Sequence, residues 1–332
     1  MAAPAFVEAL AKSVQSWCAG ATGVRDVAQL SGGASQETWS FVIARSGGDI
    51  PAILRRSPPG YGSVSGRAAG LSAEAELMRL AYDAGVPSPR VLHVLTERDG
   101  LGDGFLMQKV EGETIPRKIL RDDLFAATRP LLARQIGSIL AGLHGIDRAA
   151  LPALRTLSST EEIELLRADY RGMDWPRPVF ELALRWLADH DPGASQAITL
   201  VHGDFRHGNL IIGPDGVRAV LDWELAHLGD PMEDLGWVCV NSWRFGEIDK
   251  PVGGLGSREE MFAGYEAAGG RVDAERVKFW EVMGTLRWGI MCCGMMQRFR
   301  QGPDHSMERA MIGRRSSETE IDLLRLLAPR GA

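Results

Sequence analysis

The sequence has little of several features that mark whole classes of protein. Its 332 residues include only four cysteines, Cys18, Cys239, Cys292 and Cys293. They lie in apolar, helix-like contexts without metal-ligand spacing, so we expect reduced core thiols and a cytoplasmic location. Charge of neither sign dominates, because the net charge is -6 and the pI about 5.7. No nucleic-acid or membrane partner is therefore indicated.

Long uninterrupted apolar runs are also missing. The most apolar segment, residues 279–296, is broken by Glu281 and Arg287, which favours a buried core helix over a membrane span. The N-terminus carries Glu8 before any lysine and has no charged region followed by an apolar stretch, so no secretory signal is expected. Hydrophobic residues make up 45% and charged residues 24% of the chain. This composition is that of a globular protein, long enough for two lobes and a well-buried core.

What the chain does contain is a run of polar residues suited to phosphoryl transfer. Residues 202–209 read HGDFRHGN, and Asp222 follows Asn209 by 13 residues in the strand-like run VRAVLDWE. Transfer from a nucleotide needs a carboxylate that can accept the proton of the acceptor hydroxyl, and oxygen ligands that hold Mg²⁺ against the phosphates. We therefore predict Asp204 as the catalytic base, and Asn209 and Asp222 as the magnesium ligands.

The spacing of these residues supports the set. Glycines beside Asp204 and Asn209 suit a tight loop, and the patterns at 210–213 and 217–223 predict two strands joined by a turn. Such a hairpin returns Asp222 to the neighbourhood of the loop that carries Asp204. The alternative is that the loop and the hairpin only connect elements, with their polar groups solvated.

These motifs also carry a resemblance to a known family. HGDFRHGN, followed by LDWE and then by GDPMEDLGW, is similar to the aminoglycoside phosphotransferase and choline kinase-like family, which shares the protein-kinase fold. Upstream, LSGGASQETW, AILRRSPPG, EAELMRLAYDAGVPSPRVL and GFLMQKVEG follow the order of the family's amino-terminal segments. The resemblance thus covers most of the chain, and it is greatest to the branch fused to acyl-CoA dehydrogenases.

The resemblance implies an α+β, protein-kinase-like fold with two lobes. A small antiparallel β-sheet lobe that binds the nucleotide is expected over residues 1–108, and a larger, mainly helical catalytic and substrate-binding lobe over 109–332. Residue patterns predict five antiparallel strands, at 24–30, 37–44, 50–56, 90–96 and 104–110. They also predict helices at 6–18, 71–84, 124–144, 160–171, 179–188, 257–268, 273–299 and 305–327.

The nucleotide-binding residues follow from the order of these segments. Ser31, Gly32 and Gly33 could form a loop over the phosphates, since glycines let backbone N–H groups approach them, although SGG equally suits a hairpin turn. Gln108 and Val110 fall at the hinge, where the family contacts the base through backbone groups. ATP is therefore expected, with GTP left open.

One position departs from the family pattern. The third strand reads AILRRS and lacks the family's lysine, so Arg55 takes its place and Glu74 is its expected partner. Arginine keeps the charge and can bind phosphate with two N–H groups, but it is not equivalent to lysine. This leaves open a pseudokinase that binds nucleotide without turnover.

Two residues, His202 in the motif and Asp234 after it, are predicted to be structural at the site. Asp234 corresponds to the aspartate that braces the family's catalytic loop, and His202 is expected to hold the loop backbone. Asp230 and Pro231 form a helix start, with Glu233 placed to complete a capping box. Arg206 could neutralise charge at the phosphate or pair with nearby carboxylates.

The acceptor is expected to differ from the polycationic aminoglycosides. The segments expected to face it carry few carboxylates but several tryptophans and arginines, namely Trp243, Arg244, Trp280, Arg287 and Trp288. Indole rings offer apolar surface and guanidinium groups bind carboxylate or phosphate. This favours an anionic hydroxylated metabolite, such as a hydroxyacyl-CoA. The structural alternative is that the tryptophans are core and Arg287 is paired internally.

Three classes of function remain possible. The first is a small-molecule kinase with an alcohol acceptor, whose partners are Mg²⁺, ATP and a small hydroxylated molecule. The second is a nucleotide-binding pseudokinase or regulatory module. The third is a metal-dependent hydrolase built on His202, Asp204, His207 and Asp222, which would leave Asn209 unexplained.

Overall fold

The chain divides into two compact units in a computed structural model that describes residues 3–30, 36–58, 68–173, 175–195, 197–302 and 305–328. The sheet unit comprises Met1–Glu113, Ile146–Arg155 and Asn209–Ala226. The helical unit comprises Thr114–Gly145, Thr156–Gly208 and His227–Ala332. Residues 209–226 thus belong with the N-terminal sheet, and the domain boundary expected at residue 108 stays a prediction.

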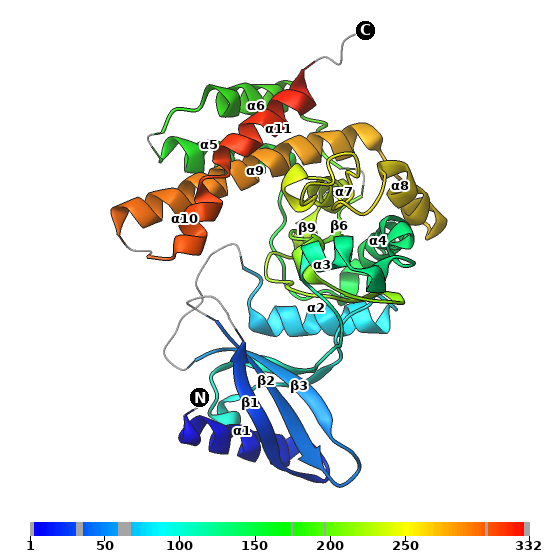
Figure 1. Cartoon of the computed structure of the whole chain (residues 1–332), viewed down its shortest axis with the longest axis vertical. Helices are drawn as coiled ribbons and strands as arrows, with labels where there is room; N and C mark the ends of the chain where they lie inside the picture. The colour runs from blue at the N-terminus through cyan, green and yellow to red at the C-terminus, as the bar shows by residue number, and fades with distance from the viewer. Residues whose placement is uncertain are drawn as a thin grey trace. The chain divides into compact units, whose positions relative to one another are not determined.

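The sheet unit is built on a five-stranded antiparallel sheet with the strand order β1-β2-β3-β5-β4, which confirms the predicted sheet (Figure 1). The strands are β1 (Ala21–Leu30), β2 (Glu37–Arg45), β3 (Ile50–Ser57), β4 (Val91–Val94) and β5 (Asp103–Gln108). Alternate residues of β2 and β3 are apolar, so one face of the sheet buries a core with helix α1 (Pro4–Trp17). A short 3₁₀ turn, η1 (Glu97–Asp99), precedes β5.

Helix α2 (Leu71–Asp83), a turn η3 (Arg148–Ala150) and a hairpin of β7 (Leu210–Gly213) and β8 (Gly216–Val220) complete the sheet unit. The hairpin forms as predicted, but its second strand ends at Val220 rather than at Trp223. Asp222 has a φ of 66°, a left-handed conformation that a strand cannot contain. The residue predicted as a metal ligand therefore lies in the turn after the strand.

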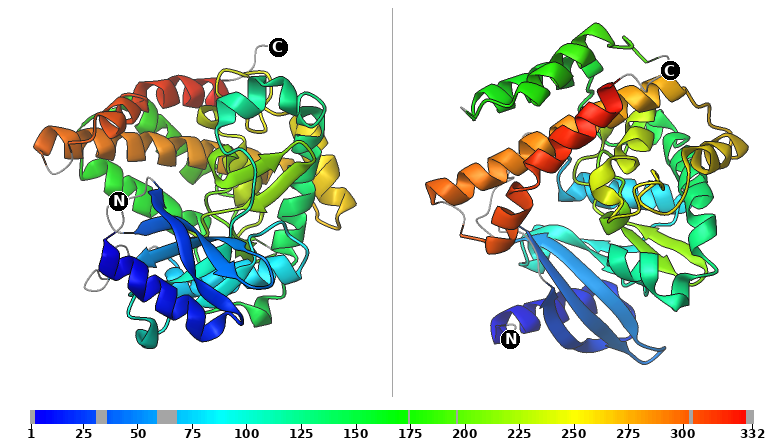
Figure 2. Two further views of the ribbon diagram at one scale, coloured as in Figure 1. Left: turned by 60° about the horizontal axis from the view of Figure 1, so that its bottom comes forward. Right: turned by 45° about the horizontal axis from the view of Figure 1, so that its top comes forward.

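The helical unit has two short strands that pair with each other, β6 (Thr199–Val201) and β9 (His227–Gly229). Its main helices are α3 (Pro116–Arg121), α4 (Arg129–His144), α5 (Ser159–Arg171), α6 (Pro178–Asp189), α7 (Met232–Val238), α8 (Arg258–Ala267), α9 (Ala274–Gln301), α10 (Met307–Gly313) and α11 (Ser316–Leu327). The 3₁₀ turns are η2 (Asp123–Phe125), η4 (His207–Asn209) and η5 (Asn241–Trp243). Helix α11 runs beside α9 in both views of Figure 2.

Two predicted helices differ from the structure. The segment 124–144 begins its helix only at Arg129, because Pro130 suits the first turn of a helix and η2 occupies the preceding residues. The segment 305–327 is two helices, because the chain turns after Gly313. A Cβ atom on Gly313 would lie 2.9 Å from the Met296 nitrogen, so this close approach to α9 fixes the turn.

Helix α7 packs unusually close to α9, and glycine allows it. A Cβ atom on Gly236 would lie 2.7 Å from the backbone nitrogen of Glu281, well inside the normal contact distance. On α9, Gly284 has no side chain and so leaves room for the ring of Trp237. The side chain of Trp237 is thereby held between the two helices.

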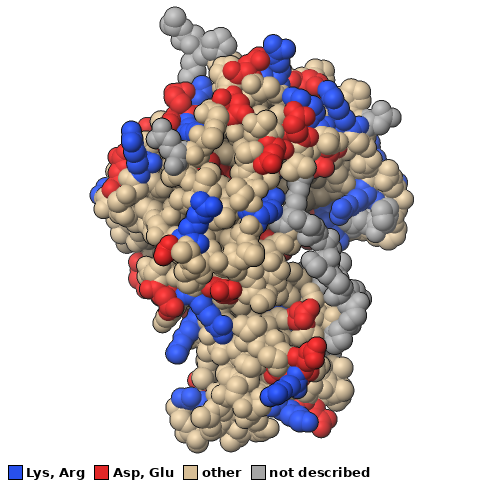
Figure 3. All heavy atoms as spheres, turned by 180° about the vertical axis from the view of Figure 1, so that it is seen from behind, with Lys and Arg blue, Asp and Glu red and all other residues tan. Residues whose placement is uncertain are grey.

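The described helices include no candidate membrane span. None of the helices in the described ranges is both long and apolar enough to cross a membrane, including the 28-residue α9. Basic and acidic side chains are interspersed on the face drawn in Figure 3. The four cysteines are buried free thiols, as predicted.

Candidate active site

Three segments of the sheet unit converge on Arg55. From β3, its Nε lies 3.2 Å from Oε2 of Glu74 on α2. Its Nη2 donates to Oδ1 of Asp222 at 2.9 Å and to Oε2 of Glu224 at 3.3 Å. Strand alternation sends the neighbouring Arg56 elsewhere, to Glu37 and the carbonyl of Leu101. The expected pair of Arg55 and Glu74 therefore forms, and Asp222 lies beside it.

This cluster carries more negative than positive charge. Glu74, Asp222 and Glu224 face the single guanidinium of Arg55. Burial raises the pKa of Glu74 to about 7, since the attraction of Arg55 is offset by Asp222 and Glu224. The carboxylates raise the pKa of Arg55 despite its burial. These three carboxylates are therefore held around one guanidinium group.

Asn209 lies next to Asp222 in the sheet unit. Its backbone carbonyl accepts a hydrogen bond of 2.8 Å from the N–H of Leu221, the residue before Asp222. The hairpin between them pairs Leu210 with Val220. The two predicted metal ligands are thus brought together, and their amide and carboxylate oxygens are donors that Mg²⁺ accepts.

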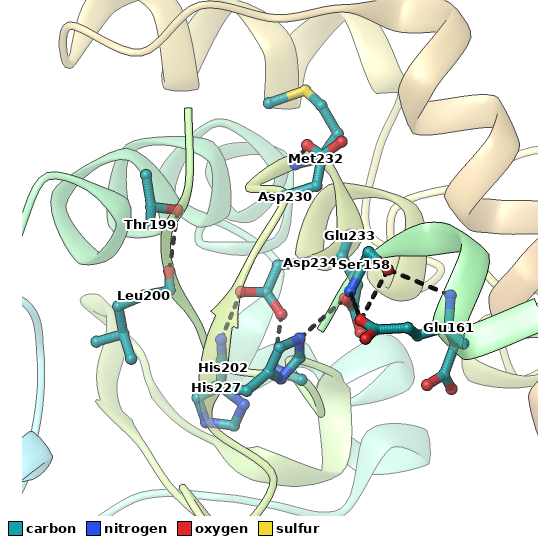
Figure 4. A network of polar contacts seen from close by, with 12 residues as sticks. Ser158, Glu161, Thr199, Leu200, His202, His227, Asp230, Met232, Glu233 and Asp234 are labelled. Carbon is teal, nitrogen blue, oxygen red and sulfur yellow. Dashed lines mark hydrogen bonds and ion pairs between the residues drawn. The ribbon is translucent and has the colours of Figure 1, made fainter. Parts of the chain in front are cut away.

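In the helical unit, the loop before Asp204 is held by one buried carboxylate. Asp234 accepts hydrogen bonds from the backbone N–H groups of His202, at 2.8 Å, and Gly203, at 3.0 Å (Figure 4). It also bonds His144 at 3.1 Å. Burial alone would raise the pKa of Asp234, but these donors lower it. Asp234 therefore stays ionised and fixes the backbone of the loop.

His202 also holds the loop, because its Nδ1 accepts the N–H of Asp204 at 3.2 Å. The ring of His202 is fully buried. The helix start downstream differs in part from the prediction. The helix begins at Met232, so Pro231 and not Asp230 is its N-cap, although the Asp230 carboxylate accepts the N–H of Met232 at 3.0 Å. Glu233 bonds His227 instead of closing a capping box (Figure 4).

The carboxylate of Asp204 is held by two donors of the helical unit. The indole Nε1 of Trp237 donates to its Oδ1 at 2.9 Å. Arg206 donates through Nε to Oδ1 at 2.9 Å and to Oδ2 at 3.2 Å, and its guanidinium lies 5.1 Å from the ring centre of Trp243. Of the two roles considered for Arg206, the structure contains the pair with a carboxylate.

His202 and His207, the two histidines of the hydrolase alternative, both form hydrogen bonds within the protein. His207 is buried, its Nδ1 bonds the carbonyl of Gly253 at 3.0 Å, and burial lowers its pKa to about 4. His202 is engaged by the loop backbone. Within the described residues, no group of three or more His, Cys, Asp or Glu side chains is arranged to hold a metal ion.

The other residues predicted to bind the nucleotide lie at the end of β5 or outside the described residues. Gln108 ends β5, where its N–H donates to the carbonyl of Arg90 at 2.8 Å. Lys109 donates through its N–H to Pro51, and Val110 follows directly. Ser31, Gly32 and Gly33 lie outside the described residues.

The five side chains expected to bind the acceptor separate into two groups. Trp243 and Trp288 pack with Trp237 in one aromatic cluster, with ring centres 4.9 to 5.3 Å apart. The others are used inside the protein: Trp280 is only 3% exposed, Arg244 pairs with Glu281 at 2.9 Å, and Arg287 pairs with Glu233 at 3.1 Å. Trp243 is itself only 5% exposed, whereas Trp288 is partly exposed. The role of all five side chains in substrate binding stays a prediction.

Sequence reasoning missed two residues that contact the predicted site. Glu224 bonds Arg55, and Trp237 bonds Asp204. Both stand in the motifs that were used, LDWE and DLGW. The type of residue was a signal in each case, since a carboxylate can pair with arginine and an indole N–H needs an acceptor when buried.

Comparison with known proteins decides the family. The model of the phosphotransferase enzyme family matches residues 26–274, which is most of the chain. The chain belongs to this family. Mouse acyl-CoA dehydrogenase family member 10 is 27% identical to the phosphotransferase over 314 residues, covering 88% of the chain and 28% of the relative. Acyl-CoA dehydrogenase family member 11 of Gallus gallus is 31% identical over 232 residues, covering 65% and 28%.

The phosphotransferase thus spans 28% of the length of these two relatives.

Solved structures establish its protein-kinase-like fold. A Ralstonia eutropha protein classed with the aminoglycoside phosphotransferases has a TM-score of 0.76 at 22% identity, covering 96% of this chain and 97% of its own. Spectinomycin phosphotransferase, solved with ADP and spectinomycin, has a TM-score of 0.65 at 13% identity, covering 96% and 98%.

Proposed function

We propose that the chain is a kinase that transfers the γ-phosphoryl group of Mg-ATP to a hydroxyl group of a small molecule. The observation that carries this proposal is the convergence of Arg55, Glu74 and Asp222 from β3, α2 and the turn after β8. A strand cation paired with a helix glutamate, beside an aspartate that can hold a metal ion, is the arrangement that positions a nucleotide triphosphate. Membership of the phosphotransferase enzyme family supports it.

Each residue then has a definite task. Arg55 binds phosphate oxygens and is oriented by Glu74, while Asn209 and Asp222 hold Mg²⁺, which neutralises charge on the phosphates when bound. Backbone groups of Gln108 and Val110 contact the base. Asp204 orients the acceptor hydroxyl and takes its proton late, because the transition state of phosphoryl transfer is loose.

The acceptor we propose has an apolar body and an anionic group, as in a hydroxyacyl thioester of coenzyme A. Trp288, which is partly exposed, gives apolar surface beside Trp243 and Trp237, the partner of Asp204. The names of the relatives, which are acyl-CoA dehydrogenase family members, favour the same class of metabolite. The pairing of Arg244 and Arg287 with buried glutamates leaves the residues that hold the anion unassigned.

The test is a screen for ADP release from Mg-ATP with hydroxyacyl-CoA thioesters, choline and kanamycin-type aminoglycosides. We expect turnover with a hydroxyacyl-CoA, and a loss of about 10² or more in kcat for Asp204→Ala with nearly unchanged binding of Mg-ATP. Efficient phosphorylation of aminoglycosides, with kcat/KM of about 10⁴ M⁻¹s⁻¹ or above, would overturn the proposed acceptor. Near-normal transfer by Asp204→Ala would overturn the role of Asp204.

A pseudokinase is the second candidate, and the contact between Arg55 and Asp222 favours it to the extent that this pair competes with the metal ion. It predicts binding of ATP without ADP release with any acceptor of the screen. ADP release in the presence of Mg²⁺ separates the two functions, because only the kinase should turn over the nucleotide.

A further inference from the structure

We infer that Trp237 is a positioning residue for the carboxylate of Asp204, and that Arg287 holds Trp237 in place. The inference rests on the proposed function of Asp204 and adds the device that sets its geometry. All of the contacts involved lie within the helical unit.

The first step is the bond between Trp237 and Asp204. An indole has one N–H in the plane of a rigid ring, so this donor fixes the direction from which the carboxylate is approached. The bond to Oδ1 is 2.9 Å long and charge-assisted, and Trp237 is only 3% exposed. By contrast, the buried indole N–H groups of Trp243 and Trp288 have no hydrogen-bond partner among the described residues. The contact of Trp237 is therefore not a general property of the aromatic cluster.

The second step is the support beneath Trp237. The guanidinium of Arg287 lies 4.1 Å from the ring centre of Trp237, and its Nη2 donates to the carbonyl of Gly203 at 3.2 Å. A single side chain of α9 thus holds both the residue before Asp204 and the ring that binds its carboxylate. Because Gly236 allows α7 to lie against α9, the ring and the guanidinium can stack.

The third step is the charge that holds Arg287. Its Nη1 donates to Glu233 at 3.1 Å and lies 3.9 Å from Glu162, and Glu233 also bonds His227 at 3.1 Å. These carboxylates are nearly fully buried. A buried ionic cluster stabilises a fold poorly, because desolvation offsets the attraction, whereas it sets geometry well. The hydrogen bonds of Arg287 to Glu233 and Gly203, and its ion pair with Glu162, thus connect it to the loop.

The experiment begins with a signal that needs no turnover. In protein labelled with ¹⁵N-tryptophan, the nine indole N–H groups give separate resonances, and Trp237→Phe identifies its own by deletion. We expect this resonance to lie downfield and to exchange slowly with solvent, and both properties to be lost in Asp204→Ala. Arg287→Lys should speed its exchange as well. An unchanged Trp237 resonance in Asp204→Ala would overturn the contact.

The second readout is steady-state ADP release from Mg-ATP, with water or a hydroxyacyl-CoA as acceptor. Trp237→Phe keeps a smaller aromatic ring and removes the donor, so kcat should fall by about 10-fold or more while KM for Mg-ATP changes less than about two-fold. The matched control is Trp17→Phe, which removes an indole N–H without a partner in the described structure. It should leave kcat unchanged.

The outcomes separate this inference from the proposed function. If Asp204→Ala abolishes ADP release and Trp237→Phe retains it, Asp204 is the base but Trp237 does not position it. If Asp204→Ala retains ADP release, or if the wild type releases none, the proposed function fails, while the resonance of Trp237 still tests the contact. If Trp237→Phe lowers the melting temperature as well as kcat, the loss of activity comes from packing and the positioning role of Trp237 is overturned.

Discussion

The guanidinium of Arg55 lies 2.9 Å from Oδ1 of Asp222, although 167 residues separate the two in the chain. Its Nε meanwhile faces Glu74. Lysine, with one ammonium group, could not bond all of these carboxylates in the same planar geometry. The arginine on the third strand is therefore an integrated part of the site.

The first prediction concerns this arginine. Arg55→Ala should weaken productive binding of Mg-ATP by about 10-fold or more, because it removes a charge-assisted contact to phosphate. Arg55→Lys should keep partial activity. Arg56→Ala is the contrast: Arg56 is buried against Glu37 and the ring of Phe6, so its loss should lower the melting temperature without raising KM for Mg-ATP. The reverse pattern in a titration would exchange the two assignments.

The second prediction concerns the metal ligands. Asp222→Ala and Asn209→Ala should each raise the Mg²⁺ concentration needed for half-maximal ATP binding, by about 10-fold or more, since each removes an oxygen ligand. Calorimetry with stepped Mg²⁺ would measure this. Asp215→Ala is the control, because Asp215 pairs with Arg218 at the exposed tip of the same hairpin. A metal dependence that stays at the wild-type value in Asp222→Ala would refute the assignment.

The third prediction concerns the packing of α7 on α9. Gly236→Ala should lower the free energy of unfolding by about 1–3 kcal/mol, because a Cβ atom there would overlap the backbone of Glu281. Gly294→Ala, also in α9, places its Cβ 3.5 Å from Met173, an ordinary contact. It should be neutral or stabilising by about 0.4–1 kcal/mol. Thermal and urea unfolding of the two variants would compare them, and equal effects would contradict the packing argument.

The fourth prediction concerns stability at low pH. Burial alone would raise the pKa of Asp99, but hydrogen bonds from Ser13 and Thr96 lower it to about 2. A carboxyl group whose pKa is lower in the folded state stabilises the fold above its unfolded pKa of 3.8, and this stabilisation is lost as pH falls toward 2. Asp99→Asn should therefore cost at most about 2 kcal/mol at pH 7, somewhat less where solvent screens the group.

The difference between Asp99→Asn and the wild type should shrink between pH 4 and pH 2, as measured by urea unfolding at stepped pH. Asp189→Asn serves as the control, because Asp189 forms an exposed pair with Arg185 within one helix. Such pairs contribute little to stability, because solvent screens their charges. If the free energy of unfolding of Asp99→Asn differs from that of the wild type by a constant amount from pH 7 to pH 2, the charge of Asp99 is not what stabilises the fold.

Local pattern determined much of this protein. Alternation along 37–44 and 50–56 predicted two strands that the structure contains, and it sent Arg55 and Arg56 to opposite sides. The turn signal at 214–216 predicted the hairpin that brings Asn209 and Asp222 together. These features depend on residues close in the chain, whose spacing is visible in the sequence.

Only the tertiary structure decided which side chains the site shares. Glu224 bonds Arg55, and Trp237 bonds Asp204, although no local period of the sequence relates these residues. The left-handed backbone of Asp222 was likewise not visible in the sequence. Arg287 was expected to bind an acceptor because guanidinium groups bind anions, yet buried Glu233 and Glu162 supply those anions. A sequence shows that a charge is present, but its partner is set by long-range packing and desolvation, which the sequence does not display.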